Sequence, residues 1–178
     1  MKRALYVLFI LVPFFVFSQE DTDKGFSLGG NVGLQFGDVT LIDVSPVLEY
    51  HFNEHLSSGI GGTYKYYKMK SLYGGSDLTS HYYGGSLFAR YYMGDEFLDF
   101  LKDVFLHTEY EMLNIRYKAY DDSGYINDMV ESVFVGGGYR SPIGRNSYAN
   151  ILVLWNLNDV VNSPYSNPLI RVGVMFGL

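Results

Sequence analysis

The sequence predicts an all-β chain, an eight-stranded antiparallel up-and-down β-barrel that crosses a membrane. Apolar and polar residues alternate along residues 41–52, and the same alternation returns along the chain as far as Leu178. A period of two with one wholly apolar face is the pattern of a strand that keeps one side out of water. A secretory leader precedes the strands, and their number is even, as in the smallest membrane barrels.

Residues 1–18 predict a signal peptide. Two of the first three residues are basic, and an apolar run follows as far as Phe17. This run is shorter than the ~20 residues that a membrane-spanning helix needs. We therefore expect cleavage between Ser18 and Gln19, which leaves residues 19–178 as one barrel domain.

The composition excludes several classes of function. The chain has no cysteine, so it carries neither disulfides nor a lipoprotein anchor, and thiol catalysis is excluded. It has 13 Lys and Arg against 19 Asp and Glu, for a formal net charge of −6 at pH 7. An acidic chain without basic clusters is a poor partner for nucleic acid. No motif in the sequence predicts a cofactor.

The alternation and the turn residues between the runs divide the chain into strands. The expected strands cover residues 26–36, 41–52, 56–69, 81–93, 104–117, 129–143, 149–156 and 168–178. Short turns at Asn53–His55 and Pro142–Asn146 belong on the periplasmic side of such a barrel. Longer connections belong outside, and here they are Lys70–Ser80, Lys118–Asp128 and Asn158–Asn167.

Aromatic residues give an independent indication of the same orientation. On the apolar faces they gather near both strand ends, as expected for girdles at two membrane–water interfaces. One girdle comprises Phe26, Tyr50, Phe52, Tyr91, Tyr139 and Phe176, and the other Phe36, Tyr64, Tyr66, Tyr83 and Trp155. A soluble barrel would reverse the faces and place these large apolar side chains in water.

The inward faces carry charges of both signs. The interior of an eight-stranded barrel is only wide enough for side chains to fill, and an unpaired ion there is costly. We therefore predict an ion-pair network that closes the lumen to ions, centred on Glu49, Glu109, Arg90 and Arg140. The predicted members are Glu49, Arg90, His107, Glu109, Glu111, Arg140 and Arg171, and the inward faces also carry Asp43, Lys65 and His51.

Two enzymatic alternatives depend on histidines. His51–His55 matches the H-x-x-E-H pattern of zinc peptidases, but that chemistry needs both histidines on one helix face. A lipid A acylase or deacylase needs a nucleophile and a base near the outer rim of the barrel. His81 with Ser80, Asp77 and Ser76 is the only such cluster on that side.

One connection departs from the short turns on its side. Asp95–Lys102 is long and amphipathic, and Asp95 would suit the N-cap of a short helix. Such a segment packs against the barrel rim or docks a periplasmic partner, and the sequence leaves both possibilities open.

Several segments resemble small outer-membrane barrels of the Bacteroidota. They are the leader ending Phe17-Ser18 before Gln19, the strand-turn-strand unit Ser45–Leu56 followed by Gly59–Gly61, and the closing strand Asn167–Leu178. The architecture is similar to that of OmpA and OmpX, although the last residue is Leu178 and the aromatic Phe176 lies two places earlier. The resemblance implies an outer-membrane location, contact with lipid, insertion by the barrel assembly machinery and a structural or protein-interaction role. It implies no catalytic residues.

Overall fold

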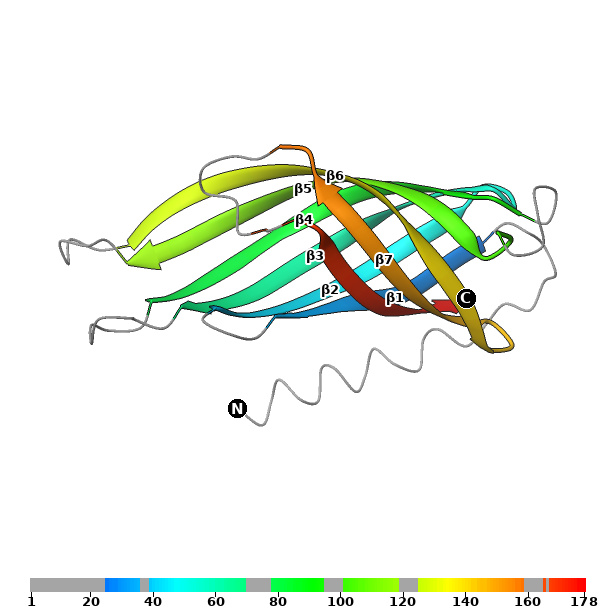
Figure 1. Ribbon diagram of the computed structural model, residues 1–178, viewed down its shortest axis with the longest axis horizontal. Coiled ribbons are helices and arrows are strands. Elements are labelled where there is room, and N and C mark those ends of the chain that lie inside the picture. Colours follow the sequence, from blue (N-terminus) through cyan, green and yellow to red (C-terminus); the bar gives the residue numbers. More distant parts are fainter. Residues whose placement is uncertain are drawn as a thin grey trace.

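The chain folds into a closed antiparallel barrel. The computed structural model describes residues 25–35, 39–69, 78–94, 101–118, 125–158, 165 and 167–178. Its strands are β1 (Gly25–Gln35), β2 (Val39–His51), β3 (Leu56–Met69), β4 (Leu78–Tyr92), β5 (Val104–Lys118), β6 (Tyr125–Gly144), β7 (Ser147–Asn156) and β8 (Leu169–Gly177). Each strand pairs with the next, and β8 pairs with β1 to close the barrel (Figure 1). The predicted fold class is confirmed.

The short turns and the chain end gather at one end of the barrel. Figure 1 shows the β2–β3 and β6–β7 turns at the same end as the start of β1 and the C-terminus. In the first turn, the side-chain oxygen of Asn53 accepts hydrogen bonds from the backbone N–H groups of His55 (2.9 Å) and Leu56 (2.8 Å). Asparagine favours turns because its side chain can satisfy nearby backbone donors in this way.

Two strands begin three or more residues earlier than the sequence predicts. β4 starts at Leu78 and β6 at Tyr125, so the expected loops Lys70–Ser80 and Lys118–Asp128 are wrong at their ends. The backbone ladders continue to Met69↔Leu78 and to Lys118↔Tyr125. Polar composition is compatible with a paired strand wherever water reaches its side chains, so composition alone does not mark where pairing stops.

The wall of the barrel is uneven around its circumference. β6 has 20 residues whereas β7 has 10, and their ladder ends at Phe134↔Asn156. In Figure 1, β5 and β6 extend well beyond the end of β7.

Three expectations concern segments outside the described residues. The signal peptide at residues 1–18 lies there, as do most of Asp95–Lys102 and parts of the long connections. Residues 101–103 form a turn that leads into β5. In the part of the chain that the structure describes, no helix is long and apolar enough to cross a membrane.

The predicted inward and outward faces are confirmed on all eight strands wherever the structure describes the side chains. In β7, for example, Asn150, Leu152 and Leu154 are buried while Ile151 and Val153 are exposed. The interior is more apolar than the sequence analysis expected, because buried side chains form apolar clusters between the polar groups. One cluster comprises Tyr92, Phe105, Phe134, Leu152 and Leu154, and another Tyr82, Leu113, Ile115 and Val130.

Glycines make room for the inward aromatic rings. Gly59 is the register partner of Phe88, and Gly138 is the register partner of Phe105. In each pair the ring occupies the space that a Cβ on the glycine would take. A glycine opposite an aromatic residue is thus how this narrow lumen accommodates large rings.

Candidate functional site: the charged interior of the barrel

Most of the charged groups that face the lumen are almost completely removed from solvent. We define the lumen network as those that contact one another, and none of its members is more than 5% exposed. The members are Asp43, Glu49, Lys65, Arg90, His107, Glu109, Glu111 and Arg171. They lie on β2, β3, β4, β5 and β8, so the barrel's closure is what brings them together.

Glu49 is the acceptor at the centre of the first part of the network. Arg90 donates from Nη1 to Glu49 Oε2 at 2.7 Å, and the Tyr92 hydroxyl donates to Oε1 at 3.0 Å. The Ser57 hydroxyl donates to the same Oε1. The Arg90 guanidinium also lies 4.7 Å from the ring centroid of Phe88. Charge-assisted hydrogen bonds in such a dry setting are the strong kind, and they fix the side chains of three neighbouring strands.

Lys65 and Arg171 form the second part of the network with three carboxylates. Lys65 Nζ lies 3.1 Å from Asp43 Oδ2 and 3.5 Å from Glu111 Oε1. Arg171 Nη1 donates to Glu109 Oε2 at 2.7 Å, and its Nη2 lies 3.8 Å from Glu111 Oε1. Because Arg171 is on the closing strand, these contacts tie β8 to β5 across the lumen.

His107 links the two parts. Its Nδ1 accepts a hydrogen bond from Arg90 Nε at 3.2 Å, and its Nε2 lies 3.1 Å from Glu109 Oε2. These roles fit an imidazole protonated on Nε2, which donates to the carboxylate. The network therefore runs without interruption from Glu49 to Arg171.

Tyr165 enters the second part from the connection between β7 and β8. Its hydroxyl contacts Lys65 Nζ and Glu111, and its ring packs edge-on against Phe134 with centroids 4.9 Å apart. The sequence analysis missed this contact, because a tyrosine in a polar connection carries no signal that it points into the lumen.

Arg140 does not take the central place that the sequence analysis assigned to it. Its guanidinium lies over the rings of Tyr92 and Tyr148, 4.5 Å and 5.3 Å from their centroids. Among the described side chains, no carboxylate lies within ion-pairing distance of it. Asp43 and Lys65 are the groups that instead complete the network. Alternation shows that Arg140 points inward, but not which groups lie opposite it across the lumen.

The two enzymatic alternatives meet different geometry. Ser80 is buried on the inward face of β4, while His81 is exposed on the outward face, with its Nδ1 2.9 Å from the Tyr64 hydroxyl. Neighbouring residues of a strand point to opposite sides of the wall, so Ser80 and His81, which the lipid A enzyme alternative groups together, do not face one another. Asp77 and Ser76 lie outside the described residues.

The zinc-peptidase pattern is not on a helix. His51 ends β2, residues 52–55 form bends, and His55 Nδ1 lies 3.0 Å from the backbone carbonyl oxygen of Tyr92. Across the described ranges, no group of three or more His, Cys, Asp or Glu side chains is arranged to hold a metal ion.

Comparisons with known proteins add only a general likeness of shape. No protein-family model matches the chain, and no curated protein matches it. A structure from the de novo design of transmembrane β-barrels is similar over 90% of this chain and 100% of its own, at 12% identity and a TM-score of 0.43. The N-terminal β-barrel domain of Pseudomonas aeruginosa OprF is similar over 88% of this chain and 98% of its own, at 11% identity and a TM-score of 0.46.

Proposed function

We propose that this chain is an outer-membrane β-barrel of a Gram-negative cell, with a sealed lumen and a structural or protein-interaction role. The leader at residues 1–18 would direct export across the inner membrane, and the barrel assembly machinery would insert the domain. The observation that carries the proposal is the distribution of side chains on the two sides of the wall. Large apolar residues are exposed outside while residues with ionisable side chains are buried inside.

The outward face suits lipid rather than water. Leu87 is 61% exposed, Ile60 is 55% exposed and Val172 is 54% exposed, and they lie on three different strands. Soluble proteins rarely expose contiguous apolar surface of this extent. Lipid contact over the whole circumference accounts for it.

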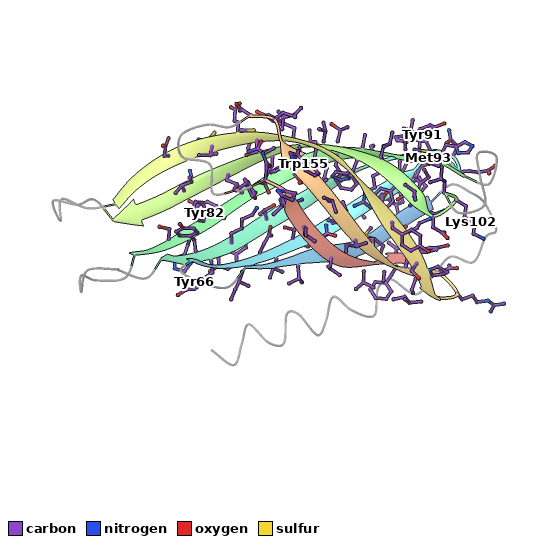
Figure 2. All side chains as sticks on the ribbon, viewed as in Figure 1. Tyr66, Tyr82, Tyr91, Met93, Lys102 and Trp155 are labelled. Atoms are coloured by element: carbon purple, nitrogen blue, oxygen red, sulfur yellow. The ribbon has the colours of Figure 1, made fainter. Side chains whose placement is uncertain are left out.

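The aromatic residues on the outward face support a bilayer orientation. Tyr91 and Tyr66 lie near opposite ends of the barrel (Figure 2). Trp155 is exposed on the outward face of β7. Aromatic side chains favour the two membrane–water interfaces, so a bilayer between these levels would cover the aliphatic residues.

The packing of the interior supports a barrel that does not conduct ions. The lumen network and the apolar clusters are each nearly free of solvent contact, and they come from strands all around the barrel. An ion would have to displace paired charges to pass, which is costly in a confined space of low dielectric. We therefore place function at the surfaces of the barrel, in lipid or in contact with a membrane or periplasmic protein partner.

Fractionation and electrophoresis test the location. The mature protein should be recovered with outer membranes, and unboiled samples in detergent should migrate differently from boiled ones because a closed ladder has no edge from which to fray. Recovery in the soluble periplasm without such a shift would contradict the proposal.

Planar-bilayer recording tests the sealed lumen separately. We expect no stable single-channel conductance from the folded wild-type monomer. A stable conductance would refute the sealed lumen while leaving the membrane location intact. A pull-down from native outer membranes then tests the interaction role: a stoichiometric partner supports it, and a solitary barrel favours a purely structural role.

A further inference from the structure

Buried polar atoms without a hydrogen-bond partner gather on the β8 side of the lumen. Among the described residues, the inward-facing ones are Asn31 Oδ1, Asp43 Oδ2, Arg140 Nε, Asn150 Oδ1, Arg171 Nε and Arg171 Nη2. Asp43 and Arg171 still lie within 4.0 Å of opposite charges. The two asparagine oxygens have no such compensation, and a buried acceptor without a donor is costly.

Both asparagine oxygens point to one place, above Gly173. Asn31 on β1 and Asn150 on β7 are the register partners of Gly173 on either side of β8. Each asparagine is only 5% exposed. Their Oδ1 atoms, together with the backbone oxygen of Gly30, lie within 3.0 Å of the point where a Cβ on residue 173 would stand. Three oxygen atoms thus converge where the chain has no side chain.

We propose that Asn31, Asn150 and Gly173 form an internal site for a water molecule. A bound water has two O–H donors, one for each amide oxygen, and its own oxygen can accept from the Arg171 guanidinium. Arg171 lies two residues along β8 on the same inward face and has two N–H groups without a hydrogen-bond partner. A buried water normally makes about three hydrogen bonds, and this site offers that number.

The charges around the site favour a neutral occupant. Oxygen acceptors repel an anion. A metal cation would be disfavoured by the positive charges on neighbouring backbone positions, since Arg140 is the register partner of Asn150 and Arg171 lies two residues from Gly173 on β8. Water satisfies the oxygens without adding charge. It also extends the lumen network to β1 and β7, so that on the β8 side a water-mediated contact adds to the direct ion pair of Arg171 with Glu109.

A crystal structure of the detergent-solubilised barrel, at a resolution that shows ordered water, tests the site directly. We expect one density peak within hydrogen-bonding distance of both Oδ1 atoms. The proposal is overturned if there is no peak and one amide is turned so that its Nδ2 donates to the other's Oδ1. It is also overturned if crystals grown in rubidium chloride show an anomalous peak there, which would identify a cation.

A matched pair of substitutions tests the same site in solution. Gly173→Ala and Gly173→Ser add the same Cβ and meet the same crowding, but only serine brings a hydroxyl donor to the convergent oxygens. We expect the serine variant to unfold at a higher urea concentration than the alanine variant. Gly25 is the control, because a Cβ there meets nothing within 4 Å, and its Ala and Ser variants should unfold alike. Equal midpoints for the two Gly173 variants, or a higher one for alanine, would show that no donor is required and refute the site.

Discussion

The two faces of the same eight strands are held in place in different ways. On the outside, Val172 and its neighbours are exposed apolar groups with no directional partner. On the inside, Arg171 is one residue away and makes specific contacts with Glu109 and Glu111 on β5. The outer face needs only the right class of side chain at each position. The inner face needs particular side chains from distant strands, so it should be far less tolerant of substitution.

Removal of β8 should have the largest effect, because it destroys both faces at once. A chain that ends at Asn167 loses the ladders of β8 with β7 and β1, together with every Arg171 contact. We expect no difference in migration between unboiled and boiled samples of this variant, with the full-length mature chain as control. A persistent shift would show that the barrel closes without β8.

Substitution of a paired arginine should be the most costly change at a single inward position. Arg90→Ala leaves Glu49 buried without its cation, and Arg171→Ala does the same to Glu109. Each should lower the free energy of unfolding by about 3–5 kcal/mol, measured by urea titration in detergent micelles.

A double variant separates the cost of an unpaired charge from the value of the pair. Glu49→Leu/Arg90→Leu leaves no ion without a partner, so it should lose less than Arg90→Ala alone. If the double variant is less stable than Arg90→Ala, then the Glu49–Arg90 interaction itself supplies the stability. Avoiding an isolated buried charge would not account for that result.

On the outer face, only a change in the class of side chain should matter. Val172→Arg places a charge against lipid and should cost about 2–4 kcal/mol at the level of the bilayer midplane. Val172→Ile is the control and should leave the unfolding midpoint close to that of the wild type. A tolerated arginine at this position would indicate that the outer face of β8 is not in contact with lipid.

The same contrast explains what could be predicted from the sequence. The faces of β2 or β8 follow from alternation within a single strand, so the outward residues named from the pattern on the described parts of these two strands lie outside. The pairing of Lys65 with Asp43 and Glu111 depends on where three strands place their side chains across the lumen, and no single strand carries that information. Tyr165 is harder still, because its position depends on a connection rather than on a strand.

Strand ends were predicted less well than strand faces, for a related reason. The backbone ladders continue to Leu78 and Tyr125, through sequence that lacks the apolar alternation from which the strand bounds are predicted. The apolar alternation that identifies a strand in lipid is not required there. The pattern therefore reports the lipid-facing part of each strand and not its full length.

Arg140→Ala should have the smallest effect of the charge-removing substitutions, although the sequence analysis placed Arg140 beside Arg90 at the centre of the network. The guanidinium of Arg140 contacts the rings of Tyr92 and Tyr148, and no described carboxylate depends on it. Loss of ring contacts of this kind costs about 0.5–2 kcal/mol, well below the cost of isolating a buried carboxylate.

Urea titration of Arg140→Ala beside Arg90→Ala measures the difference in unfolding free energy. Arg140→Lys keeps a cation over the rings, so its unfolding midpoint should lie closer to that of the wild type. In planar-bilayer recordings of the same variants, Arg90→Ala should show more ion leakage than Arg140→Ala. Equal losses for the two alanine variants would contradict this contrast and indicate that a buried carboxylate depends on Arg140 as well.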